Sequence, residues 1–253
     1  MLEVIAGADP FDSTASAREV PCYTSLLYDP ARYKVACLEE TFSHGGLQPE
    51  IKDHTLDGLE LLKKAGHQVD NVHFELLKYA LPTYYILVNA EASTNLARFD
   101  GIRYGYRSSH ATTLEEVYIK TRTEGFAKEV KKRIMLGAFV LSASQCETHY
   151  IKALKVRNMI KKVMQDILSH YDFIILPTTT TTAFKVNSFV SNPLSMYWSD
   201  LYTVLASVAG LPAISLPNGV DQKGLPIGMQ VIGNYFEEAK LLSFASHFES
   251  IVK

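Results

Sequence analysis

The segment that most constrains the fold is residues 171–176, which read Tyr-Asp-Phe-Ile-Ile-Leu and are followed by Pro177. An almost continuous apolar run of this length is typical of a strand that is buried on both faces of a sheet. Such strands occur mainly where helices cover both sheet faces, as in α/β proteins. We therefore expect residues 171–176 to form a central strand of an α/β fold.

A strand–helix–strand pattern lies earlier in the chain. Residues 33–38 predict a strand, and residues 69–74, which alternate apolar with polar side chains, predict another. Between them, residues 50–65 carry apolar side chains at helical spacing, with Gly66 positioned as the C-cap. Because strands joined through a helix pair in parallel, this pattern predicts a βαβ unit with a right-handed crossover.

The rest of the chain continues the alternation of helices and strands. Further helices are predicted over residues 76–96, 113–125, 128–162, 193–208 and 237–251, and further strands over residues 213–216 and 227–232. The long third helix is expected to be interrupted near residues 142–144. At the N-terminus, the apolar residues Leu2, Val4 and Ile5 stop at Gly7. They predict either a short strand or, as we favour, the end of a longer helix.

Composition and spacing exclude several classes of function. The formal net charge is −2, and no basic block exceeds residues 131–133, which argues against autonomous nucleic-acid binding. The three cysteines are far apart and the histidines lack metal-ligand spacing, so we expect reduced thiols and no metal site. No apolar stretch reaches membrane-spanning length, and Glu3 stands where a signal peptide would carry a base. We expect a soluble, cytoplasmic protein.

Four segments are more specific than their composition. They are Glu91 to Gly101 with the following Arg103-Tyr-Gly-Tyr106; residues 129–137, Glu-Val-Lys-Lys-Arg-Ile-Met-Leu-Gly; residues 171–178; and Asp200-Leu-Tyr-Thr followed by residues 209–217 and 224–230. Each alone has an ordinary explanation, such as a helix end or a turn. In this order they are similar to the amidase signature family, and the first segment narrows the resemblance to the A subunits of glutamyl-tRNA(Gln) amidotransferases.

The resemblance runs over essentially the whole chain and is weakest between residues 21 and 47. It implies an α/β fold in which a mixed central β-sheet is covered by helices. It also implies that residues 1–253 are the C-terminal portion of an amidase signature domain whose N-terminal catalytic portion is missing. The missing portion would explain why the apolar segment at residues 2–5 stops after so few residues.

The family's chemistry is acyl transfer by a serine nucleophile, which a lysine and a second serine activate. These three groups lie in a Gly/Ser-rich segment of the family's N-terminal half, and no segment of this sequence matches it. We therefore assign no catalytic residue. Ser142 and Ser144 lie in a predicted helical region and receive no role. The chain alone is expected to be inactive.

The half represented here would contribute the glutamine-binding side of the family's site. A free amino acid needs a cation for its carboxylate and an anion for its ammonium, and the planar fork of arginine suits a carboxylate. The family motifs imply these roles for Arg133 and Asp200, with a further substrate contact from Tyr84, which we prefer over Tyr85. The five threonines at residues 178–182 correspond to a loop near the family's active site.

Without the resemblance, each of these residues has a structural explanation. Arg133 would belong to a solvated helix face, Asp200 to a helix cap, and Tyr84 to core packing with its hydroxyl satisfied. Residues 178–182 would be an extended connector, because consecutive threonines disfavour a helix.

The resemblance implies that the intact protein hydrolyses L-glutamine and passes ammonia to a partner subunit. That partner would use ATP and Mg to convert Glu-tRNA(Gln) to Gln-tRNA(Gln), while the present chain would hold no cofactor. The implied partners are the B and C subunits of a heterotrimeric amidotransferase. Two alternatives remain open: half of a general amidase that hydrolyses another small amide, and a non-catalytic module that binds an amino acid or a protein.

Overall fold

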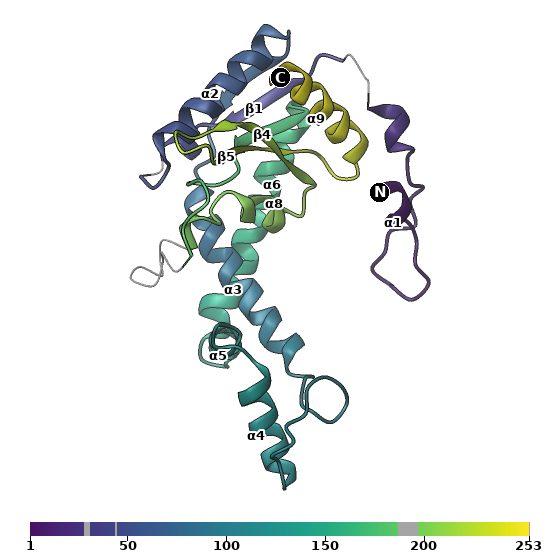
Figure 1. Cartoon of the computed structure of the whole chain (residues 1–253), viewed down its shortest axis with the longest axis vertical. Coiled ribbons are helices and arrows are strands. Elements are labelled where there is room, and N and C mark those ends of the chain that lie inside the picture. Colours follow the sequence, from purple (N-terminus) through teal and green to yellow (C-terminus); the bar gives the residue numbers. More distant parts are fainter. Residues whose placement is uncertain (28–30, 44, 187–196, 253) are drawn as a thin grey trace. The chain divides into compact units, whose positions relative to one another are not determined.

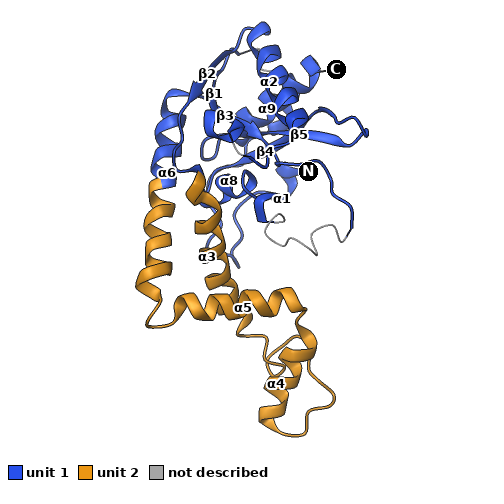
Figure 2. Ribbon diagram, turned by 90° about the vertical axis from the view of Figure 1, so that its left-hand side faces the viewer, with its two compact units in different colours: residues 1–77, 160–253 blue, residues 78–159 orange. Residues whose placement is uncertain are grey.

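The computed structural model describes residues 1–27, 31–43, 45–186 and 197–252. The chain divides into two compact units, which Figure 2 colours separately. Unit 1 combines Met1–Leu77 with Ile160–Lys253, and unit 2 comprises Lys78–Met159. Unit 2 is therefore inserted, in sequence, between two parts of unit 1.

Unit 1 contains a five-stranded sheet with the order β2-β1-β3-β5-β4 (Figure 1). The strands are β1 (Lys34–Leu38), β2 (Gln68–Val72), β3 (Phe173–Pro177), β4 (Ala213–Val220) and β5 (Pro226–Ile232). Strand β1 pairs in parallel with both β2 and β3, whereas β5 is antiparallel to both β3 and β4. The sheet is mixed, as expected. Strand β3 is central and buried along its whole length, which confirms the prediction from its apolar run.

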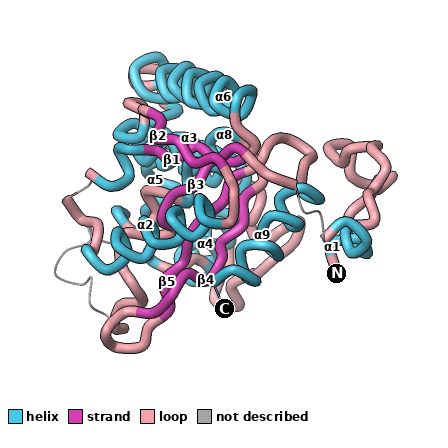
Figure 3. The backbone as a smooth tube through the Cα atoms, turned by 90° about the horizontal axis from the view of Figure 1, so that it is seen from above, coloured by secondary structure: helices cyan, strands magenta, loops and turns pink. Residues whose placement is uncertain are grey.

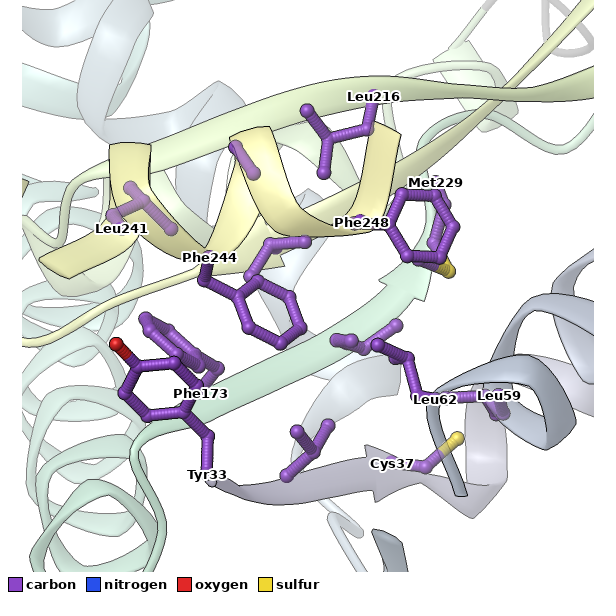
Figure 4. Close-up of a cluster of buried hydrophobic side chains, with 14 residues drawn as sticks. Tyr33, Cys37, Leu59, Leu62, Phe173, Leu216, Met229, Leu241, Phe244 and Phe248 are labelled. Atoms are coloured by element: carbon purple, nitrogen blue, oxygen red, sulfur yellow. The ribbon is translucent and has the colours of Figure 1, made fainter. Parts of the chain in front are cut away.

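The main core of unit 1 lies between the sheet and two helices, α2 (Pro49–Lys64) and α9 (Glu238–Val252). Figure 4 shows Phe244 of α9 beside Phe173 of β3, and Phe248 of α9 beside Met229 of β5. The rings of Phe173 and Phe244 are 4.5 Å apart. Burying several aromatic and aliphatic side chains on one sheet face supplies the main apolar stabilisation of this layer.

The remaining helices of unit 1 are shorter or shared with unit 2. They are α1 (Leu2–Ile5), the 3₁₀ turns η1 (Tyr23–Leu26) and η2 (Glu39–Phe42), α8 (Thr203–Ala209) and the C-terminal part of α6 (Lys152–His170) (Figure 3). Three deeply buried side chains of α6, Ile160, Met164 and Ile167, recur at helical spacing and give that helix an apolar face.

Unit 2 is helical within its described residues. It contains α3 (Leu77–Leu96) from Lys78 onward, α4 (Leu114–Gly125), α5 (Lys128–Leu141), the π-helical segment η3 (Cys146–Ile151) and the first turns of α6. The predicted interruption near residues 142–144 is confirmed, because α5 ends at Leu141 and Ser142 adopts an extended conformation.

Several predicted boundaries differ from the structure. The C-cap of α2 is Ala65, and Gly66 is the next residue, with a φ of 95° that favours glycine. Strand β4 continues four residues past its predicted end, to Val220. The predicted helix at residues 193–208 begins outside the described residues, and its described part is regular only from Thr203. The apolar N-terminal residues form one helical turn, α1, rather than a strand.

Candidate functional site

The threonine loop at residues 178–182 directly follows β3 and is tied to the neighbouring strands. The Thr178 backbone N–H donates to the carbonyl of Gly228, with 3.1 Å between the atoms. The hydroxyls of Thr178 and Ser215 share a hydrogen bond of 2.7 Å. A β-carbon on Gly228 would lie 2.8 Å from the Ser215 hydroxyl oxygen and 2.9 Å from that of Thr178. Glycine at this position therefore leaves space for the hydroxyl pair.

Contacts from two other segments fix the far end of the threonine loop. The Gln48 N–H donates to the Thr180 carbonyl, and the Gln48 side-chain oxygen accepts the Thr182 N–H, each over 3.0 Å. The Thr182 hydroxyl donates to Asp221 over 2.9 Å. The pKa of Asp221 is lowered, first by the N–H of Leu225 and further by this hydroxyl. Hydrogen bonds therefore hold the loop at both ends, and the hydroxyls of Thr178 and Thr182 each take part in one.

Asp200 is half-buried in the turn before α8. Its carbonyl accepts the Val204 N–H and the Thr203 hydroxyl, both over 3.1 Å, and its own N–H donates to the carbonyl of Tyr197. The backbone of Asp200 thus stabilises the turn that leads into α8, whose N-cap is Tyr202.

Two buried side chains hold the segment that carries Asp200. The Tyr202 hydroxyl donates to the carbonyl of Thr41 over 2.7 Å, and burial raises the pKa of this phenol. The buried Gln230 side chain of β5 donates to the carbonyl of Tyr202 over 3.2 Å. Because buried polar groups are costly to leave unpaired, these bonds position the turn firmly.

In unit 2, Tyr84 and Tyr85 are consecutive residues of α3 and both are half-buried. Their rings meet edge to face, with centroids 5.4 Å apart and planes at 81°. Helix α3 contacts α5 where the carbonyl of Asn89 lies against Gly137. Asn89 and Ser93, one turn apart on α3, both lie against that glycine. The two helices that carry the predicted tyrosine and arginine are thus in backbone contact.

Arg133 lies one turn before Gly137 on α5. Its Nε is 3.6 Å from a carboxylate oxygen of Glu129, and its side chain is 36% exposed. Of the neighbouring lysines, Lys131 donates to the carbonyl of Thr123, whereas Lys132 is 3.5 Å from the same Glu129 carboxyl group. The long contact with Glu129 is weaker than a bidentate pair. A planar guanidinium of this kind can still bind the carboxylate of a ligand by donating hydrogen bonds to it.

The predicted site residues divide between the two units. Tyr84 and Arg133 belong to unit 2, and Asp200 and the threonine loop belong to unit 1. The sequence did not single out the hydroxyl pair of Thr178 and Ser215. Thr178 and Ser215 both lie in segments that carry the family resemblance, but nothing in the sequence indicates that their hydroxyls meet.

The described residues contain no group of three or more His, Cys, Asp or Glu side chains that could hold a metal ion. Among the helices that the structure describes, none is both long and apolar enough to cross a membrane.

Comparison with known sequences gives a consistent result. The family model described as Amidase matches residues 1–242. The A subunit of glutamyl-tRNA(Gln) amidotransferase from Clostridium botulinum (strain Alaska E43 / Type E3) is 45% identical over 253 residues, which is 100% of this chain and 52% of that protein. The protein of the same name from Halothermothrix orenii is 46% identical over 250 residues, or 98% of this chain and 52% of its own length. The chain spans about half the length of the curated relatives it matches.

Solved structures agree on the fold. The A subunit of glutamyl-tRNA(Gln) amidotransferase from Thermotoga maritima superposes with a TM-score of 0.71 and 34% identity, covering 94% of this chain and 46% of that one. A bacterial aryl acylamidase of the amidase signature family has a TM-score of 0.74 at 20% identity, covering 99% of this chain and 50% of that chain. The mixed sheet with its helices is therefore the arrangement found in part of these enzymes.

Proposed function

The chain belongs to the amidase family, and on that premise we propose that it forms part of the glutaminase subunit of a glutamyl-tRNA(Gln) amidotransferase. The intact protein would release ammonia from L-glutamine. The observation that carries this proposal is the 45% identity with the Clostridium botulinum protein, which extends over the whole chain. Among the solved structures, the identity is 34% with the Thermotoga maritima A subunit and 20% with the aryl acylamidase.

The contribution of this chain would be to bind glutamine rather than to cleave it. In the proposal, the Arg133 guanidinium pairs with the α-carboxylate and the Asp200 carboxylate pairs with the α-ammonium. Tyr84 would contact the same ligand from α3. A cation for the carboxylate and an anion for the ammonium would select a free amino acid over a ligand without these charges, because each charge of the ligand needs a partner when it leaves water.

The other parts of the reaction would lie outside this chain. The nucleophile and its activating groups would come from a segment that matches the rest of the relatives' length. ATP and Mg would be used by the partner subunit that converts Glu-tRNA(Gln) to Gln-tRNA(Gln). The proposed assembly contains B and C subunits beside this one, and its role in translation would place it in the cytoplasm.

A chimera tests the proposal. The part of the Clostridium botulinum protein that this chain does not match would be joined to residues 1–253, and ammonia release from L-glutamine would be measured. Arg133→Ala should lower kcat/KM about 10- to 100-fold, since a hydrogen bond to a charged group contributes roughly 1.5–3 kcal/mol. Lys132→Ala, on the same helix, is the matched control and should leave activity nearly unchanged.

Two outcomes would favour other functions. A chimera that hydrolyses simple aliphatic or aryl amides faster than glutamine would indicate a general amidase. If residues 1–253 alone form a monomer with one cooperative melt and bind an amino acid while the chimera stays inactive, a non-catalytic binding module would be indicated instead.

A further inference from the structure

Strand β5 carries a single polar side chain, that of Gln230, within the sequence Pro-Ile-Gly-Met-Gln-Val-Ile. Gln230 is buried, with 5% of its surface exposed. Its neighbours Met229 and Val231 belong to the core that the sheet shares with α2 and α9. Because successive side chains of a strand alternate between the two faces, Gln230 lies on the opposite face of the sheet. A buried amide is more costly than a buried leucine unless it is hydrogen-bonded, so a specific contact must explain it.

That contact is with the backbone of the segment leading into α8. The Gln230 side-chain nitrogen donates to the carbonyl of Tyr202 over 3.2 Å. The same carbonyl accepts the Leu205 N–H over 3.3 Å, within the first turn of α8. In the sheet, Gln230 stands opposite Leu176 of β3 and Ser215 of β4. The bond therefore ties the start of α8 to a strand that is itself paired on both sides.

The side chain of Tyr202 provides a second tie to the sheet. It is fully buried, and its hydroxyl donates to the carbonyl of Thr41 over 2.7 Å. Thr41 belongs to η2, directly after β1, and its own hydroxyl donates to the carbonyl of Leu38 over 2.6 Å. Burial raises the pKa of the Tyr202 phenol, which keeps it protonated as a donor. Backbone and side chain of this one residue are thus bound to two separate segments.

Asp200 lies two residues before Tyr202, in the same turn. The hydrogen bonds of its backbone are to Tyr197, Thr203 and Val204, all within that turn. Such local bonds shape the turn but move with it. The two bonds of Tyr202 reach residues far away in sequence, so they set where the turn lies relative to the sheet. The place of the Asp200 carboxylate therefore depends on them.

We propose that Gln230 is a positioning residue for ligand binding. By holding the Tyr202 carbonyl, it sets the place of the Asp200 carboxylate that would pair with the α-ammonium of glutamine. The inference rests on the proposed function, which gives Asp200 that role. Gln230 itself would not touch the ligand. Its effect would be confined to the ammonium end of the ligand, and so to binding rather than to cleavage of the amide.

Gln230→Leu in the chimera tests the inference, because leucine stays buried but offers no donor. The KM for L-glutamine should rise about 2- to 10-fold, as for the loss of one hydrogen bond, with a smaller change in kcat. The second substrate is 4-carbamoylbutanoate, which is glutamine without its α-amino group. Its KM should be the same for the parent and the variant. A residue that merely supports the fold would change the KM of both substrates.

A double-mutant cycle with Asp200→Asn provides the second readout. If Gln230 acts through the Asp200 carboxylate, its replacement should change the KM for glutamine less than about twofold once that carboxylate is gone. Independent effects that multiply in the double variant would mean that Gln230 acts in another way.

A matched pair of tyrosine variants repeats the test without changing the sheet. Tyr202→Phe removes only the bond to the Thr41 carbonyl and should raise the KM for glutamine but not for 4-carbamoylbutanoate. Tyr235→Phe removes a bond of the same length, 2.7 Å, to the Ala209 carbonyl at the other end of α8, and should change neither KM. This pair keeps the inference testable if Gln230→Leu does not fold.

The outcomes separate this inference from the proposed function. An Asp200→Asn chimera with an unchanged KM for glutamine would count against the proposed role of Asp200 and overturn the inference with it. If Asp200→Asn raises that KM while Gln230→Leu or Tyr202→Phe alters the KM of both substrates equally, only the inference is overturned.

Discussion

The backbone carbonyl of Asn89 on α3 lies directly against Gly137 on α5, so that a β-carbon at residue 137 would overlap the carbonyl oxygen. The β-carbon of Ser93 would lie 2.5 Å from the same added β-carbon. The absence of a side chain at Gly137 is what lets these two helices meet backbone to backbone.

We therefore predict that Gly137→Ala destabilises the protein, although alanine favours a helix over glycine by about 1 kcal/mol. The overlap is with backbone that cannot rotate away, and overpacking costs typically about 1–3 kcal/mol. Urea denaturation would measure the free energy of unfolding. Gly45→Ala, whose added β-carbon would have no other atom of the described residues within 4 Å, is the control and should be nearly neutral. A stabilised Gly137→Ala variant would contradict the close contact.

The hydroxyl pair of Thr178 and Ser215 gives a second prediction. Gly228→Ala should lower the free energy of unfolding by about 1–3 kcal/mol, because its β-carbon would press on both hydroxyls. Ser215→Ala removes one of them and should recover part of this loss in the double variant. The measurement is a double-mutant cycle, with an expected coupling of about 0.5–3 kcal/mol. Strictly additive effects would show that the two positions do not touch.

The buried His67 predicts a dependence of stability on pH. Its Nδ1 accepts the Tyr33 N–H over 3.1 Å, so the ring must be neutral at that atom. Burial lowers the pKa of His67 below its ordinary 6.5, and His247 and Arg32 lower it further. Below pH 6.5 the unfolded chain therefore binds a proton that the folded chain excludes, and stability is lost as the pH falls from there toward the lower folded pKa.

His67→Gln should flatten this slope, since glutamine offers an oxygen acceptor and does not titrate. Chemical denaturation at several pH values between about 7.5 and 5 would measure it. His110→Gln, in an exposed loop position, is the control and should keep the slope of the parent chain. An unchanged slope in His67→Gln would mean that another group is responsible.

In the chimeric enzyme, Asp200→Asn should raise KM for L-glutamine more than it lowers kcat. The reason is that an amide replaces the anion proposed to pair with the α-ammonium of the bound ligand, before and after the reaction alike. Steady-state kinetics would separate the two constants, with any loss of helix checked by circular dichroism. Glu238→Gln, a like change at the first residue of α9, is the control. An effect confined to kcat would place Asp200 in another role.

Much of unit 1 could be predicted because its signals are local. The apolar run of β3 and the spacing of apolar residues in α2 both show which side chains are buried, and each pattern is visible within a few consecutive residues. The predicted end of β4 was wrong because Pro217 usually stops a strand. Here β4 is the last strand of the described sheet, and its register shifts between Pro217 and Val220, where a missing N–H is tolerated.

The candidate site was less predictable because its contacts join distant segments. The family resemblance identified Tyr84, Arg133 and Asp200 as residues, and their roles stay predictions. It could not indicate that the Asp200 carbonyl accepts the Val204 N–H or that Glu129 lies beside Arg133. Those facts depend on backbone geometry and on neighbours that no motif encodes.

The insertion of unit 2 between β1 and β3 has a consequence for synthesis. These two strands are hydrogen-bonded neighbours, yet the ribosome makes roughly 135 residues between them, which takes on the order of ten seconds. During that interval the edge of β1 that later pairs with β3 lacks this partner strand. A long separation between paired strands slows folding and leaves strand edges open to misassembly, so this edge of β1 stays exposed until Phe173 emerges.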